Sequence, residues 1–499
     1  MFEEIGQVLL GLIKEIGEMI VTALRKPEGW FLVVAVLLAA SALLAPFLQA
    51  GTASNVSFTT WLITHNFAEA DGAVTAGSVM WGTTLWLVSM WWLWLFFALT
   101  PIFRELWLFW VREKTKETSK WSLIELKIPR IVAETAQAME SVMVSLNNLG
   151  GGPDNFRETF INGDMVKWMN LEIVSIGGNV RFFVRCPKGV KDEVEAAFFA
   201  YYPDVDISHP DKDYMDEIPA NMIDVYAQNM DVFGSEMKLD KDEMYPLKSY
   251  VDFKADDPEK AIDPISNLIE AMGKIKPGEI AALHFLCIPG DKKWHEAFMA
   301  KVAELRLGGA KPDKDGKIVP RFLSPGETQL IKSIEIHLTK YVFDTVVRMF
   351  HVGPAEGSTG QYFRKSVTGY FNQYASLNMN GFKPVGGMST RVVPHESPYF
   401  FIKERLEYRK QKILHVFRKR DVPTDLYWGK WFQTYFFNSG FHAKTIRLTT
   451  EELATLWHPP TEFVLTSPHI ERAESKKAGP PAGLAIFGEE EELNRFYGK

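Results

Sequence analysis

Cysteine is scarce in this sequence, which contains only Cys186 and Cys287 among 499 residues. Two thiols cannot form a disulfide framework or a cysteine-rich metal site, so both are excluded, and a reducing compartment is permitted. Each cysteine follows an apolar, strand-like run. We therefore expect both to be buried residues at the ends of strands rather than nucleophiles.

An excess of positive charge is also lacking. The 55 lysines and arginines are outnumbered by 62 aspartates and glutamates, which gives a formal net charge of -7. Proteins that bind nucleic acid over much of their surface are usually basic, so this class is excluded. Any such binding would require a local basic patch.

Catalytic motifs are absent as well. The glycine-rich run at 353–360 (GPAEGSTG) lacks the lysine that a phosphate-binding loop uses to reach the β- and γ-phosphates. The sequence has no H-E-x-x-H, no cysteine–histidine cluster and no G-x-S-x-G elbow, and His442, His458 and His469 are irregularly spaced. We predict no catalytic residue, no metal site and no cofactor. That the chain is an enzyme with an unrecognised site is the least favoured of three hypotheses, after the two binding functions given below.

Two uncharged stretches have the length of a membrane span. Residues 30–50 (WFLVVAVLLAASALLAPFLQA) and 78–103 (SVMWGTTLWLVSMWWLWLFFALTPIF) contain no Asp, Glu, Lys or Arg. About 20 apolar residues are needed to cross the hydrocarbon core of a bilayer, and tryptophan favours the membrane interface. The sequence therefore predicts a two-span membrane anchor over residues 27–120.

Basic residues predict the orientation of this anchor. The loop at 51–77 contains no lysine or arginine, whereas basic residues flank both spans. They are Arg25, Lys26, Arg104, Arg112, Lys114, Lys116 and Lys120. The positive-inside rule then places both termini in the cytoplasm, as in a multi-pass protein of the bacterial inner membrane.

Residues 1–26 form a separate predicted element. Apolar residues such as Ile5, Leu9, Leu12 and Ile16 recur at helical spacing, which indicates an amphipathic N-terminal helix. Two interpretations stay open: the helix lies on the inner membrane surface, or it packs on the soluble domain or on a partner.

The soluble part begins near residue 121 and predicts the fold class α+β. A strand at 122–129, a helix at 134–149, a hairpin around Gly177 and Gly178, a helix at 190–202 and a strand at 204–208 follow in order. This β-α-β-β-α-β order predicts a ferredoxin-like, or split βαβ, unit over residues 121–210.

A second ferredoxin-like unit is predicted over residues 211–350, in tandem with the first. Two segments, RFFVRCPKGVKDEVEAAF and ALHFLCIPGDKKWHEAFM, share the order strand, cysteine, proline, glycine and helix start. Duplication of one unit or chance similarity would explain them. A strand is expected at 245–253, and helices are expected at 263–275 and 293–305. A mixed α/β region at 351–448 and a linker and tail at 449–499 follow.

One segment is strongly basic. Its eight basic residues are Lys403, Arg405, Arg409, Lys410, Lys412, Arg418, Lys419 and Arg420. Nucleic acid or anionic lipid is one candidate ligand. The alternative is a solvated helix face, or a surface that pairs with acidic segments of the same chain.

The tail segments TTEELATLWHPP and TSPHIERAESKKAGPPAGL, together with SLIELKIPR and MNLEIVSIGGNVRFFVRCP, resemble a known family. They are similar to the membrane-anchored, non-ATPase N-terminal region of conjugation-type (type IV secretion) ATPases of candidate-phyla bacteria. The resemblance covers about residues 121–484. In fused relatives a motor domain follows this region. Here the sequence ends without Walker motifs, so the motor is expected to be a separate subunit or to have been lost.

The resemblance implies a function. The chain is expected to be a non-enzymatic membrane-anchored scaffold of a type IV secretion or conjugative DNA-transfer apparatus, docking a separate FtsK/HerA-type ATPase. The expected docking residues are Glu451, Glu452, Leu453, Leu456 and Trp457. Expected partners are the lipid bilayer, further copies of the chain, the ATPase and DNA. The alternative function is a membrane-tethered nucleic-acid-binding module that uses the basic segment.

Overall fold

The computed structural model describes residues 91–129, 135–148, 151–253, 263–291, 293–306, 323–391, 401–422 and 445–461. They fall into two compact units. Residues 91–117 and 155–163 belong to the first unit, and the other described residues belong to the second.

The prediction of transmembrane helices is not supported. Within the described ranges, no helix is both long enough and apolar enough to cross a bilayer. Residues 91–103 of the predicted second span begin helix α5 (Trp91–Thr118), which contains Pro101 and becomes rich in charged residues after Phe103. The predictions of a multi-pass topology and of an inner-membrane localisation depend on such helices, so they are not supported either. The predicted span at 30–50 and the helix at 1–26 lie outside the described residues.

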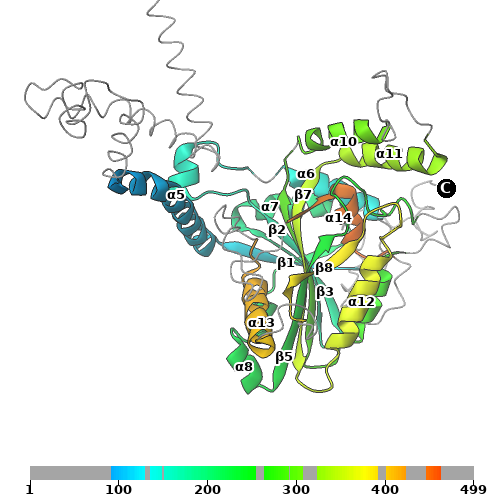
Figure 1. Cartoon of the computed structure of the whole chain (residues 1–499). Helices are drawn as coiled ribbons and strands as arrows, with labels where there is room; N and C mark the ends of the chain where they lie inside the picture. Colours follow the sequence, from blue (N-terminus) through cyan, green and yellow to red (C-terminus); the bar gives the residue numbers. More distant parts are fainter. Residues whose placement is uncertain are drawn as a thin grey trace, which may run out of the picture. The chain divides into compact units, whose positions relative to one another are not determined.

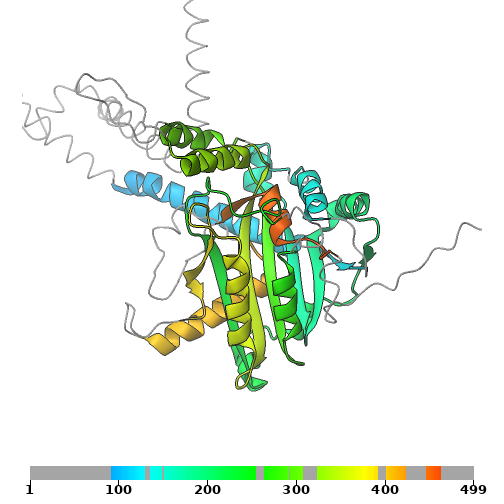
Figure 2. The same ribbon diagram turned by 90° about the vertical axis from the view of Figure 1, so that its right-hand side faces the viewer.

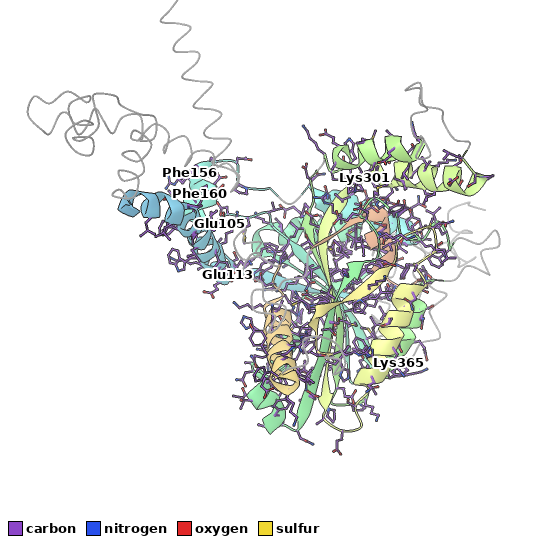
Figure 3. All side chains as sticks on the ribbon, viewed as in Figure 1. Glu105, Glu113, Phe156, Phe160, Lys301 and Lys365 are labelled. Atoms are coloured by element: carbon purple, nitrogen blue, oxygen red, sulfur yellow. The ribbon has the colours of Figure 1, made fainter. Side chains whose placement is uncertain are left out.

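The first unit pairs α5 with a short π-helix, η1 (Glu158–Asn162). The indole Nε1 of Trp107 donates to the Phe160 carbonyl at 2.7 Å, and the Thr115 hydroxyl donates to the Asn162 carbonyl at 2.6 Å. Phe156 and Phe160 stack with their ring centroids 4.5 Å apart (Figure 3). Gly163 has a φ of 69° and lies against Val111 of α5, so a larger residue would not fit there.

The second unit begins with the predicted order of elements. They are β1 (Trp121–Lys127), α6 (Ala136–Asn147), β2 (Met169–Ile176), β3 (Asn179–Pro187), α7 (Lys191–Tyr201) and β4 (Asp206–Ser208), with the short η2 (Lys188–Val190) before α7. The strands lie in the order β4-β1-β3-β2, which is the arrangement of a split βαβ unit. The predicted hairpin is confirmed, because Gly177 and Gly178 turn between β2 and β3 with φ values of 59° and 95°.

The following elements repeat this arrangement. They are β5 (Met230–Leu239), α9 (Ser266–Gly273), β6 (Ile280–Pro289), β7 (Val342–Pro354), α12 (Gly360–Asn372) and β8 (Phe382–Ser389). Their strand order β6-β7-β5-β8 is the order of the first half read from its other edge. The strand expected at 245–253 is irregular instead, and β5 opens the second half.

The two halves share one antiparallel sheet because β2 pairs with β6. This joint runs in register from Met169 opposite Cys287 to Ile176 opposite Ile280. A ninth strand, β9 (Ile446–Thr449), pairs with the first residues of β7. The α+β class is therefore correct, and a continuous nine-stranded sheet joins the halves.

Helices cover both faces of the sheet. On one face, α6, α7, α9, α12 and α14 (Thr450–Leu456) enclose the larger apolar core. On the other face, η3 (Tyr214–Glu217), α8 (Met222–Ala227) and α13 (Ile402–Lys419) enclose a smaller one. Figure 1 shows α13 and α8 on the side of the strands opposite α12, and Figure 2 shows the sheet from the α12 side, with α12 in front of the strands.

One connection breaks the repeat. A tight turn joins β2 to β3, whereas residues 290–341 join the equivalent strands β6 and β7 and contain α10 (Glu296–Arg306) and α11 (Pro325–Leu338). We call α10 and α11 the helical insertion. It has its own small apolar cluster around Trp294, Phe298 and Ile334, and α11 begins with a capping box between Ser324 and Glu327.

Candidate functional site

A row of charged and polar side chains crosses the sheet beneath α13. Glu172 of β2 lies opposite His284 of β6, His284 lies opposite Arg348 of β7, and Arg348 lies opposite Glu236 of β5. All four are fully buried. Directly opposite residues point to the same face of a sheet, so strand pairing alone assembles this polar row.

Glu172 is the centre of the row. Its carboxylate pairs with the Arg420 guanidinium, with 2.7 Å between Oε1 and Nε, and accepts a hydrogen bond from the Tyr214 hydroxyl at 2.6 Å. Asn170 donates to the same carboxylate at 2.6 Å. Arg420 also pairs with Asp213. These contacts connect η3 and the end of α13 to the middle strands.

Burial and charge set the protonation states. Burial lowers the pKa of His284 well below its usual range, and the positive charges of Arg420, Arg348 and Arg185 lower it further. His284 is therefore neutral, and its Nε2 lies 2.7 Å from the Tyr214 hydroxyl. Burial raises the pKa of Glu172, an effect that Arg420 opposes, while the carboxylates hold the pKa of Arg420 above its usual range against desolvation.

The Arg348–Glu236 pair completes the row. The Arg348 Nη2 lies 2.6 Å from Glu236 Oε1, and its Nη1 donates to the Val416 carbonyl of α13 at 3.2 Å. The Phe417 ring stacks on His284 and on Phe350, with centroids 4.4 and 3.9 Å away. The row therefore attaches α13 to the sheet. The ionisable groups of the row pair with one another.

The predicted basic segment does not form one exposed patch. Arg405, Arg409, Lys410 and Arg420 are buried, while Lys412 and Arg418 are half-buried. Lys410 pairs with Asp231 at 2.7 Å, and Arg418 donates to the carbonyls of Met215 and Ile218. Only Lys403 and Lys419 of the eight are exposed. Much of this segment pairs with other parts of the chain, and binding of nucleic acid or anionic lipid stays a prediction that rests on few accessible charges.

The predicted ATPase-docking residues lie in α14 and its C-cap. Glu452, Leu453, Leu456 and Trp457 are buried, and Glu451 is half-buried. Trp457 packs edge-on against Phe182 and Phe198 of the larger core. Glu452 caps its own helix through Thr449 and accepts from the Leu247 backbone at 2.8 Å. The four buried side chains therefore hold the fold together and are not available to a partner in this structure, whereas Glu451 is partly accessible and pairs with Lys340 at 2.8 Å.

The glycine-rich run at 353–360 begins with the last two residues of β7 and ends with the first residue of α12. However, the Glu279 carboxylate occupies the start of α12. It accepts from the Thr359 backbone N–H at 3.1 Å and lies 3.0 Å from His351 Nε2. A carboxylate of the chain thus already satisfies the anion-binding tendency of this helix start.

His458 and the two cysteines are also structural. His458 lies between the Asp263 carboxylate (3.0 Å) and the Ala454 carbonyl (2.9 Å). Both cysteines are buried at strand ends as predicted, and burial raises each thiol pKa to about 12. Within the parts of the chain that the structure describes, no group of His, Cys, Asp and Glu side chains could hold a metal ion. His442 and His469 lie outside those parts.

Three cavities border α11. The largest, about 430 Å³, lies between α10, α11 and residues 242–245. The second, about 280 Å³, lies beside Trp294 and Leu338, and the third, about 200 Å³, lies beside Ile336 and His337. Met299 and Ile336 are also exposed on the insertion, at 55% and 51%. The helical insertion thus combines hollows with accessible apolar side chains.

The fold and these features define an α+β protein of two βαββαβ halves with one helical insertion. Comparison with known proteins adds no family to this description: no protein-family model matches the chain, and no curated protein is significantly similar to it.

Proposed function

We propose that this chain is a non-enzymatic scaffold that docks a separate motor ATPase of the FtsK/HerA type through its helical insertion. The observation that carries the proposal is the insertion itself. It replaces a tight turn of the repeated unit, borders three cavities and exposes Met299 and Ile336. Elements added to a repeated framework often carry its specific function.

Two further observations support a binding role. The buried ionisable groups beneath α13 form ion pairs and hydrogen bonds with one another and with the backbone. The sequence resemblance to the non-motor region of conjugation-type ATPases supports the choice of partner. The membrane anchor is no part of this proposal.

The test uses the purified full chain and the FtsK/HerA-type ATPase encoded nearest to it. Biolayer interferometry is expected to show saturable binding, and Ile336→Glu is expected to raise Kd at least tenfold because it places a charge on the exposed face of α11. Ile223→Glu is the matched control, since Ile223 is 79% exposed on α8. The chain alone is expected not to hydrolyse ATP.

Absence of saturable binding would contradict the proposal. So would an equal loss of affinity in the Ile223→Glu control, or nucleotide hydrolysis by the chain without the ATPase.

A further inference from the structure

Helix α5 uses one of its faces to pack within the first unit. Leu108 and Val111 are buried on this face. Gly163 lies against Val111, and the Thr115 hydroxyl, one turn further along, donates to the Asn162 carbonyl at 2.6 Å. Residues three and four apart share a face of a helix. The segment that contains η1 therefore covers this face of α5.

The opposite face of α5 is apolar and exposed. Its residues are Leu95, Leu99, Phe103, Leu106 and Trp110, and each of them is 48–66% exposed. Successive members are four, four, three and four residues apart, which is the spacing of the seam between two packed helices. We call these five residues the α5 stripe. A contiguous exposed apolar patch of this kind is typical of an interaction site.

We infer that the α5 stripe is a dimer interface, at which α5 of a second copy of the chain packs antiparallel to it. This inference goes beyond the proposed function and does not depend on it. The five side chains expose roughly 500 Å² in one copy, so a pair of stripes would bury roughly 1,000 Å², the lower limit for a specific protein interface. An interface of this size predicts a reversible rather than a permanent dimer.

The order of residues along the α5 stripe makes the stripe complementary to itself. With a two-fold axis midway between residues 103 and 106, Phe103 of each copy faces Leu106 of the other, and Trp110 faces Leu99. Each aromatic ring then packs against a leucine, so large and small side chains alternate across the seam. In a parallel pair, rings would face rings and leucines would face leucines, and the helices would be unevenly spaced. The antiparallel pair is therefore the one that fits, and it has the two-fold symmetry of most homodimers.

The first experiment measures the mass of the purified full chain by sedimentation equilibrium over a range of concentrations. The native chain is expected to form a reversible dimer. Leu106→Glu is expected to raise the Kd of this dimer by about tenfold or more, because it places a carboxylate in the apolar centre of the interface. Leu377→Glu is the matched control and is expected to leave Kd unchanged, since Leu377 is 97% exposed and lies in the second unit.

The second experiment tests the direction of pairing. Spin labels are attached to Leu99→Cys and, in a separate sample, to Leu106→Cys; both native cysteines are buried. In the antiparallel dimer the two labels at residue 99 are expected to lie roughly 10 Å farther apart than the two labels at residue 106, because each residue adds a rise of about 1.5 Å along the helix axis. In a parallel dimer the two distances would be equal.

A monomeric native chain would overturn the inference, whether another part of the chain or a lipid surface covers the α5 stripe instead. An unchanged Kd in Leu106→Glu, an equal rise of Kd in Leu377→Glu or equal label distances at the two positions would overturn it as well. None of these results concerns binding of the ATPase to the helical insertion, so the proposed function would stand.

Discussion

Replacement of Arg420 by methionine tests the polar row most directly. Arg420 is 2% exposed and pairs with Glu172, which is completely buried. At 2.7 Å and an effective dielectric constant of about 20, their attraction is roughly 6 kcal/mol. Much of this is offset by the desolvation of both ions. The net effect of removing one partner is instead to leave a buried charge uncompensated, which costs about 3–5 kcal/mol.

The loss is also expected to depend on pH. Burial already raises the pKa of Glu172, and Arg420 opposes that rise. Without Arg420 the folded-state pKa lies further above the unfolded-state value. A raised carboxyl pKa costs stability once the pH exceeds the unfolded value, and the cost grows until the pH reaches the folded value. Arg420→Met is therefore expected to lose less stability at pH 5 than at pH 8.

Urea denaturation of the full chain, followed by tryptophan fluorescence at both pH values, measures these losses. The control Lys403→Met removes an exposed cation of α13 and is expected to change the free energy of unfolding by less than about 0.5 kcal/mol. The double variant Glu172→Gln/Arg420→Met removes both charges and is expected to recover at least half of the loss. A loss below about 1 kcal/mol for Arg420→Met, or no recovery in the double variant, would refute the reasoning.

Three further predictions concern other buried groups. Cys186 and Cys287 are expected to resist a thiol reagent at pH 8 in the folded chain and to react fully in urea, because burial raises both pKa values to about 12; fast labelling of the native protein would disagree. Trp457→Ala is expected to cost about 3–5 kcal/mol in urea denaturation, since the indole is fully buried in the larger core, whereas a surface role would leave stability unchanged. The pKa of Asp263 is lowered to about 2 beside His458, so its contribution is present above about pH 4 and is lost as the pH falls toward 2; the stability difference between the chain and Asp263→Asn is expected to shrink over that range.

Much of the fold follows from local sequence patterns. The glycine pair at 177–178 predicts the β2–β3 hairpin. The sequence pattern does not predict strand β5, because Gly234 and Glu236 interrupt the alternation of its apolar residues. The structure explains both interruptions: a Cβ at Gly234 would lie 2.5 Å from Ile413 of α13, and Glu236 pairs with Arg348.

The polar row could not be predicted in the same way. Glu172 and His284 each interrupt an otherwise largely apolar strand, which is the only local sign of a buried partner, and Arg348 shares β7 with Asp344 and His351. Arg420 is 248 residues from Glu172 along the chain, and a cluster of basic residues does not reveal which acids it meets. The same limit applies to α14: its apolar residues fit a docking helix or a core helix equally well, and only tertiary packing distinguishes the two.

The polar row also accounts for how the two halves join correctly. The joint strands β2 and β6 are buried along almost their whole length, so apolar periodicity cannot fix their register. A shift of either strand by one residue would turn its own polar residue, Glu172 or His284, toward the larger apolar core, away from Arg420 and Tyr214. Because an unpaired buried charge is so costly, the row excludes that register. The double variant Glu172→Gln/Arg420→Met should therefore recover stability, but it should exclude the shifted register of β2 and β6 less strictly. Amide hydrogen exchange is then expected to be faster in β2 and β6 of this variant than in the native chain.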